Sequence, residues 1–324
     1  MEPLLLLLGA LLAGFAGYTA QNASICSVRA VAEVFEDRDY RLLASFAKAV
    51  ICATAIAAPL GWTIFGEIDT EMPRLTLFVL AGGFLFGLGA ALNNGCAVST
   101  VNHLASGDGA MLVTLGGLAA GSLLAVHLHG GVTEGGATPF LAIPGTLQAA
   151  IVVTAWLWTV LELRRLLLRR TTGRTRSLTI AAIALGLCNG ILFVLQGPWA
   201  YTAAIAQSSG YAFGWNPAPH LVVLVLFLAL LAGAAISAWR SGRFRPRWRA
   251  ERSWAQHLLG GLFMGGGAAL VPGGNDAVLL NALPLLAQHA LPAFGAMLLG
   301  VVAGLSLQRR PRFRAWESPL LTDS

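Results

Sequence analysis

Residues 82–95, GGFLFGLGAALNNG, recur 178 positions later as GGLFMGGGAALVPG at residues 260–273, with eight of 14 positions identical. Gly and Ala make up most of these matches. In both copies an apolar helix of small residues is followed by a polar break, a short apolar stretch and another long apolar helix. A weaker match, at an offset of 175, places Gln21 over Gln196 and Cys26 over Tyr201. We therefore expect the chain to contain two structural repeats.

The composition of the chain is typical of a membrane protein. Of its 324 residues, 56% are hydrophobic and 11% are charged, and the mean hydropathy is +0.70. Soluble domains carry about 25% charged residues, so this composition argues against a soluble globular protein, a disordered chain and a nucleic-acid binder. The 38 glycines fit close packing of helices in a bilayer.

Nine apolar segments have the length of about 20 residues that a membrane-crossing helix needs. The polar stretches 93–109 and 272–290 are too polar to cross, and we expect each to form a re-entrant half-helix element. Irregular backbone is tolerated at membrane depth only when it is buried in protein or lines a cavity. The nine predicted crossings are residues 3–23, 43–64, 75–92, 110–128, 141–163, 178–196, 217–239, 254–271 and 291–308.

Basic residues set the predicted orientation. Nine alternating crossings put 20 of the 21 Lys and Arg on one side, in blocks after the first, fifth, seventh and ninth segments, and leave only Arg74 on the other. The loop at 66–74 carries three acids instead. Because cytoplasmic loops are rich in Lys and Arg, we expect the N-terminus outside and the C-terminus in the cytoplasm. The first segment lacks a basic leader region, so we read it as a membrane helix and not as a signal peptide.

These observations predict an all-α integral membrane protein of about nine transmembrane helices, two re-entrant half-helix elements and an inverted-topology repeat. Residues 1–140 form the first half and residues 178–324 the second, with a short cytoplasmic tail. Residues 141–177 supply the connecting helix and an Arg-rich cytoplasmic loop, and this odd helix inverts the second half. Many secondary transporters follow this plan, with the substrate site near the midplane where broken helices meet.

The first polar break holds five candidate site residues: Asn93, Asn94, Gly95, Cys96 and Ser99. A half-helix that begins near Cys96 would turn its N-terminal amides toward the membrane centre, where such an end attracts anions. Polar groups at this depth are costly and usually functional. The alternative interpretation is that the two Asn residues cap helix ends and that Cys96 is a small packing residue.

The second break supplies Gly273, Gly274, Asn275 and Asp276. We expect Asp276 to be the only acid inside the membrane, where it either caps the following half-helix or takes part in proton coupling. His103, in the first re-entrant stretch, is the other candidate for proton coupling.

Cys26, in the stretch SICSVRAV, follows the first segment and lies near Gln21 and Asn22. It is either a core residue or part of a polar route through the protein. The four cysteines form no CxxC pair, and no His pair has zinc-ligand spacing beside a third ligand. We therefore expect no disulfide framework, no metal ion and no cofactor. The lipid bilayer is the expected environment, and nucleic acid is not an expected partner.

The two Gly-rich signatures, the ICSVRAV cysteine and the nine crossings resemble the YeeE/YedE family of sulfur-transport proteins, which includes thiosulfate permeases. The resemblance covers most of the chain. It implies uptake of thiosulfate or a related small sulfur anion across the bacterial inner membrane, with cysteines at a central constriction in contact with the substrate. Cys26 and Cys96 match two of the family's three cysteines, whereas Gly274 stands opposite Cys96 where the third is expected. This departure leaves the cargo open, a selenium species included.

Two other functions remain open at this point. A membrane-embedded sulfurtransferase could use Cys96 as a persulfide carrier, although that would require an activated thiolate and His103 is the only base near it in sequence. A scaffold without transport activity is the third interpretation. The sequence also leaves open whether a small cytosolic sulfur-carrier protein receives the cargo.

Overall fold

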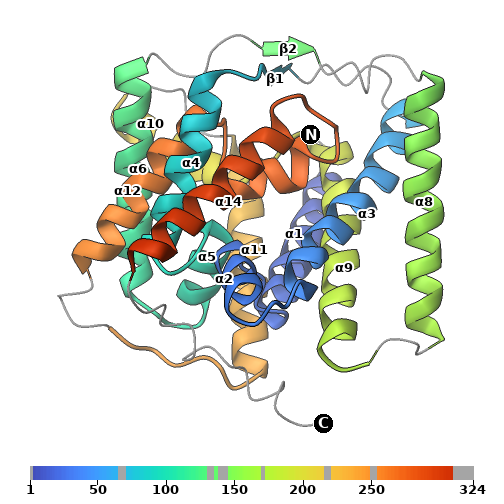
Figure 1. Ribbon diagram of the computed structural model, residues 1–324, viewed down its shortest axis with the longest axis horizontal. Coiled ribbons are helices and arrows are strands. Elements are labelled where there is room, and N and C mark those ends of the chain that lie inside the picture. Colours follow the sequence, from blue (N-terminus) through green and yellow to red (C-terminus); the bar gives the residue numbers. More distant parts are fainter. Residues whose placement is uncertain are drawn as a thin grey trace.

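The computed structural model describes residues 3–64, 71–129, 135–137, 145–168, 172–214, 220–248 and 254–308, and it shows an all-α membrane protein (Figure 1). Each of the nine predicted crossings overlaps a long helix, and residues 141–144 and 217–219 of two of them lie outside the described part of the chain. Eight helical stretches among the described residues are long and apolar enough to span a membrane, and the ninth helix, α12, has 17 residues. The long helices are α1 (Pro3–Asn22), α3 (Arg41–Ile64), α4 (Leu77–Leu92), α6 (Ala110–His129), α8 (Thr146–Leu167), α9 (Gly173–Gln196), α11 (Leu221–Arg240), α12 (Trp254–Leu270) and α14 (Ala290–Leu307).

Four of the long helices, α1, α4, α9 and α12, are each followed by a four-residue break and a short helix. The short helices are α2 (Ser27–Glu36), α5 (Ala97–Ala105), α10 (Tyr201–Ala212) and α13 (Asn275–Ala277), the last of which continues as the π-helix η2 (Val278–Ala282). The polar breaks in the sequence had predicted α5 and α13 but not α2 or α10. The two additional short helices begin next to Cys26 and at Tyr201, the positions that the weaker repeat match had paired.

Each break contains backbone in the left-handed region, which ends the long helix and redirects the chain. The residues with positive φ are Ser24 (51°), Asn94 (55°), Gly197 (77°) and Gly273 (105°), with Pro272 at 25°. Gly and Asn adopt this conformation at the lowest steric cost. Two of the four breaks therefore have a glycine where the chain turns, and a third has an asparagine.

Glycines bring the long helices into backbone contact where they cross. The pairs are α4 with α12 and α14, α6 with α12, α1 with α11, and α3 with α9. A Cβ on Gly87 of α4 would lie 2.0 Å from the carbonyl oxygen of Met297 in α14. A Cβ on Gly121 of α6 would lie 2.1 Å from that of Leu262 in α12. Small residues allow such close approach, and the van der Waals contacts it creates hold helices together in lipid.

The two ends of the molecule differ in charge. β1 (Glu71–Pro73) and β2 (Gly135–Ala137) form a short antiparallel pair at one end, whereas α2, α5 and the start of α9 lie toward the other (Figure 1). This second end, hereafter the basic end, carries Arg174 and the strap Arg243–Arg247. The strap pairs with the α5–α6 turn, where Arg245 N–H donates to the Ser106 carbonyl at 2.9 Å. Residues 66–70 of the predicted acidic loop 66–74, and the basic tail at 309–314, lie outside the described residues.

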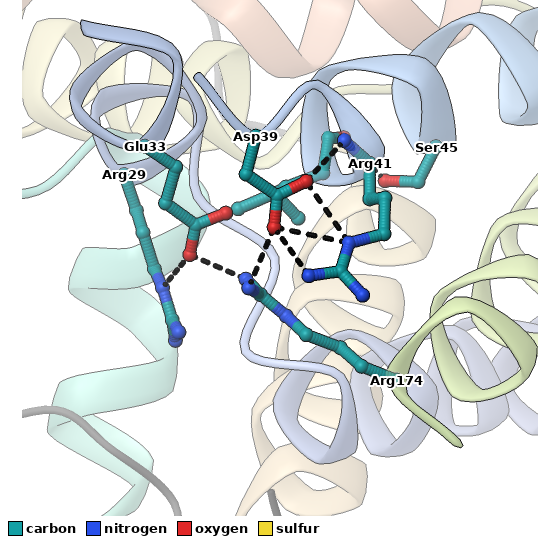
Figure 2. A network of polar contacts seen from close by, with 7 residues as sticks. Arg29, Glu33, Asp39, Arg41, Ser45 and Arg174 are labelled. Carbon is teal, nitrogen blue, oxygen red and sulfur yellow. Dashed lines mark hydrogen bonds and ion pairs between the residues drawn. The ribbon is translucent and has the colours of Figure 1, made fainter. Parts of the chain in front are cut away.

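Ion pairs fix α2 at the basic end (Figure 2). Arg29 donates to Glu33 at 2.7 Å within α2, and Arg174 of α9 bridges Glu33 and Asp39, the latter at 3.2 Å. Arg41 donates to both carboxylate oxygens of Asp39 at 3.0 Å and thereby holds the pKa of Asp39 below its ordinary value. The network joins α2, the α2–α3 turn and the start of α9, so it anchors the helix that begins beside Cys26.

A second acid is buried within a predicted crossing, contrary to the expectation that Asp276 would be the only one. Glu162 of α8 is 4% exposed and pairs with Lys48 of α3. The ammonium group of Lys48 also donates to the Thr179 hydroxyl of α9 at 2.8 Å. Arg165, three residues further along α8, also pairs with Glu162 at 3.3 Å, whereas Lys48 lies 114 residues away in sequence and could not be assigned to Glu162 from the sequence of α8.

Candidate functional site

Cys26 and Cys96 occupy the N-cap positions of α2 and α5, in extended backbone and without a side-chain cap. Both are buried and free, and their thiols are in contact. The Cys96 thiol faces the backbone N–H and hydroxyl of Ser27, and the Cys26 thiol faces the Ser99 hydroxyl and the backbone of Cys96. Each thiol therefore lies at the first turn of the other cysteine's helix. Two helix N-termini and two soft sulfur atoms converge on one point.

We call each of the four breaks, together with the first turn of its short helix, a tip. Asn93 anchors the first predicted tip, which begins at residue 93, to the rest of the protein. Its Nδ2 donates to the Gly95 carbonyl at 3.1 Å and to the Thr100 hydroxyl at 3.0 Å. Its Oδ1 accepts from the Thr114 hydroxyl at 2.8 Å and lies 2.8 Å from Nδ1 of His257. The amide is thus occupied by protein partners from α5, α6 and α12, and it holds the break in place.

The neighbouring residues of the first tip have different environments. Asn94 supplies the left-handed φ of the break and is half-buried. A Cβ on Gly95 would lie 2.5 Å from the Ser99 hydroxyl, so only a glycine lets Ser99 keep its position. His103 is buried in the last turn of α5, seven residues after Cys96. At 1.5 Å per residue this is about 10 Å of helix rise away from the thiol pair.

Asp276 ties the two short helices of the second half together. Its Oδ1 accepts from the Thr202 hydroxyl at 2.7 Å and its Oδ2 from the Thr202 backbone N–H at 3.1 Å. The same hydroxyl accepts from the Gly274 N–H at 2.9 Å. Asn275 reaches across to the first half, where its Nδ2 donates to the Ser27 hydroxyl at 3.5 Å. The residues of both predicted tips and Cys26 are thus brought together.

The structure explains why no side chain stands opposite Cys96. A Cβ on Gly274 would lie 2.9 Å from each of three groups, which are Oδ1 of Asp276, the Phe86 ring and the Thr202 methyl group. A third cysteine would therefore need these neighbours to move. Gly273, with φ at 105°, makes the turn that places this backbone against them.

Two cavities lie near these tips. One of about 240 Å³ is lined by α6, α10 and α12 and ends at Pro272 and Gly273. A smaller one of about 80 Å³ is lined by α1, α3, α5 and α9 together with Trp199, Tyr201 and Asp276. Neither lining contains Lys or Arg. An anion in these cavities would meet no Lys or Arg side chain, and in the smaller one it would meet the carboxyl group of Asp276.

Trp199, Tyr201 and Thr202 were not among the residues that the sequence singled out for the site. All three are buried around the start of α10. The pairing of Cys26 with Tyr201 in the weaker repeat match was the signal that could have found them.

A family model described as sulphur transport matches residues 22–303. The match begins at the end of α1, extends into α14 and includes both cysteines of the thiol pair and all four breaks. No curated protein matches this chain. With this coverage and its apolar helices, the chain belongs to the sulphur transport family, the YeeE/YedE family of multi-pass membrane transporters.

Proposed function

We propose that the protein carries thiosulfate or a related sulfur-containing anion across the bacterial inner membrane, through the point where its tips meet. The observation that supports this most directly is the contact of two buried free thiols, Cys26 and Cys96, at the N-termini of α2 and α5. Helix N-termini favour negative charge, and a thiol is a weak donor suited to a soft sulfur atom. Because no cation lines the cavities, binding stays weak enough for the anion to leave again.

In this proposal the basic end faces the cytoplasm, since basic loops remain on that side. The N-terminus then lies outside, the C-terminus lies in the cytoplasm, and residues 1–140 and 178–324 act as inverted halves joined by residues 141–177. The anion arrives at the basic end, where a small cytosolic sulfur-carrier protein could receive it.

We further propose that Asp276 is protonated while the anion passes, because an ionised carboxylate would repel it. Its two hydrogen bonds from Thr202 also fit the simpler role of a helix cap. The variant Asp276→Asn separates the two roles: a proton-coupling acid should change the pH profile of uptake, whereas a cap should not. His103, buried in α5, is tested in the same way with His103→Gln.

The test is growth on thiosulfate as the only sulfur source, in cells that lack their own sulfate and thiosulfate importers. We expect growth with the wild type, none with Cys96→Ala and reduced growth with Cys26→Ala. Cys188→Ala is the matched control, because Cys188 is equally buried but packs within α9. Immunoblots of membranes confirm equal expression. Normal uptake by a well-expressed Cys96→Ala variant would remove the central claim.

The same variants separate transport from sulfurtransferase activity. A persulfide carrier would retain labelled sulfane sulfur on the purified protein after incubation with thiosulfate, and Cys96→Ala would release it. A transporter would accumulate label inside cells or vesicles without a stable label on Cys96.

A further inference from the structure

We infer that Trp199 and Tyr201 form an oxygen-binding subsite beside the thiol pair, so that the cargo is a sulfur oxyanion and not an oxygen-free sulfur species. This inference rests on the proposed function and names the class of anion for the same site. The sulfur end of the anion would point to the cysteines of the first half, and the oxygen end to the two aromatic residues of the second half.

The starting observation is a pair of buried donors without protein partners. Nε1 of Trp199 and the hydroxyl of Tyr201 have no hydrogen-bond partner among the described residues, although the two residues are only 8% and 4% exposed. Buried indole and phenol groups usually find a partner. Both side chains line the cavity of about 80 Å³. The cavity therefore has two donors that a ligand can use.

Both donors are held in place by the surrounding protein. The Trp199 carbonyl accepts from Nδ2 of Asn281 in η2 at 2.8 Å, which fixes the break before α10. The Tyr201 ring stacks on Phe227 of α11, with ring centroids 6.4 Å apart and planes inclined by 23°. A ligand that meets such fixed groups loses less binding free energy to ordering them.

The other polar groups of the cavity leave these donors available. Asp276 lines the same cavity, but both of its carboxylate oxygens accept hydrogen bonds from Thr202. A third unpartnered atom among the described residues, Oδ1 of Asn275, is an acceptor, and Asn275 does not line this cavity. The donors therefore face a ligand that accepts hydrogen bonds, which is the property of the oxygens of a sulfur oxyanion.

The size of the cavity suits such an anion. A cavity of about 80 Å³ is several times the roughly 10–15 Å³ that a single water needs by the same measure, so it has room for a small tetrahedral anion. With its oxygens on Trp199 and Tyr201, the anion would direct its soft sulfur atom toward the neighbouring thiol pair. The thiols do not line this cavity, but Ile25, next to Cys26, and Val98, two residues after Cys96, do. In the weaker repeat match Tyr201 stands over Cys26, so the second half offers a hydrogen-bond donor where the first offers a thiol.

This arrangement predicts selectivity. A site built to donate hydrogen bonds rejects an analogue that lacks the acceptors, because its buried donors are then left unpaired. Hydrosulfide has a single sulfur atom and no oxygen, so it cannot contact the thiol pair and accept from Trp199 and Tyr201 at the same time. Thiosulfate should therefore lose affinity when these donors are removed, and hydrosulfide should not.

The experiment measures the KM for uptake of radiolabelled thiosulfate, and its inhibition by hydrosulfide, with Tyr201→Phe and Trp199→Phe. Each substitution removes one donor and keeps an aromatic side chain. We expect KM to rise about tenfold or more in each, since a hydrogen bond to a charged group corresponds to that range. The inhibition constant of hydrosulfide should stay within about twofold of the wild type, because hydrosulfide cannot accept as an oxyanion does. Tyr211→Phe and Trp156→Phe, at exposed positions, are the matched controls.

The outcomes separate this inference from the proposed function. Wild-type uptake that needs Cys96 but keeps its KM in both aromatic variants overturns the oxygen-binding subsite alone. Equal weakening of thiosulfate and hydrosulfide also overturns it, because the effect would then come from altered packing. Absence of thiosulfate uptake by the expressed wild type overturns the proposed function together with the subsite. If Trp199→Phe fails to reach the membrane, Tyr201→Phe alone decides.

Discussion

The variant Gly87→Ala tests the backbone contact between α4 and α14. The added Cβ would lie 2.0 Å from the Met297 carbonyl oxygen and 2.9 Å from both the Met297 carbonyl carbon and the Val301 nitrogen. All three atoms belong to the backbone of α14, so no side chain can rotate away. The helices must therefore separate by at least 1.0 Å before the first distance reaches 3.0 Å, below which Cβ contacts are essentially never found.

The size of the effect follows from two opposing terms. Overpacking in a well-packed region costs about 1–3 kcal/mol, and a clash with rigid backbone belongs at the upper end. Replacing Gly by Ala in a helix gains about 1 kcal/mol. Gly116→Ala on α6 is the matched control, because no atom lies within 4 Å of its added Cβ. The propensity gain cancels between the two variants, so Gly87→Ala should be about 3 kcal/mol less stable than Gly116→Ala.

A thiol-reactive fluorescent dye can report unfolding of the detergent-purified protein, because all four cysteines are buried and free. Upon heating, Gly116→Ala should unfold at or slightly above the wild-type midpoint. Gly87→Ala should unfold several degrees lower, by the usual relation between stability and Tm. Equal midpoints for the two variants would show that α4 and α14 do not touch at Gly87, and the packing argument would fail.

Two further predictions concern the anchors of the tips. Asn93→Ala leaves the buried Thr114 hydroxyl and the His257 ring without their partner and should cost about 2–4 kcal/mol in the same melting assay. Asn94→Gly, which keeps the left-handed φ, should be neutral, and equal losses in both would contradict the role of Asn93. Arg41 lowers the pKa of Asp39 in the folded protein, so the stability from this pair is complete above the ordinary carboxyl pKa. This stability is lost as the pH falls through the lowered pKa that Asp39 has in the folded protein. The melting midpoint of Asp39→Asn, which cannot lose this pair, should therefore fall less on acidification than that of the wild type. Parallel plots of melting midpoint against pH for the two proteins would refute the pairing.

Hydropathy predicted the long helices because lipid demands about 20 apolar residues for each crossing. The same criterion could not find α2 or α10, which have 10 and 12 residues and read as connecting loops. Short polar breaks between apolar runs located the tips at Cys96 and Gly274. Polar groups at membrane depth are costly, so such breaks stand out in an apolar sequence.

The partners within the site could not be predicted, because they come from distant parts of the sequence. Asn93 was expected to face a substrate or to cap a helix. It does stand at the C-cap of α4, and its side chain also bonds to Thr114 and His257, 21 and 164 residues away. The hydroxyl of Thr202 reaches Asp276 over 74 residues. Such contacts depend on how the helices cross, and the crossing of two helices cannot be predicted from the sequence of either one alone.

The glycine contacts also restrict how the protein can move. Every close crossing joins a helix of residues 1–140 to one of residues 178–324, as in α4 with α14 and α1 with α11. A swinging motion of one half past the other would drive carbonyl groups into facing backbone along all of these crossings at once. In the proposed transport, alternating exposure of the two sides would therefore come from small changes at the four tips. Side-chain rotations occur in picoseconds to nanoseconds, whereas collective domain motions take microseconds to milliseconds, so such local changes would not have to wait for the long helices to move past one another.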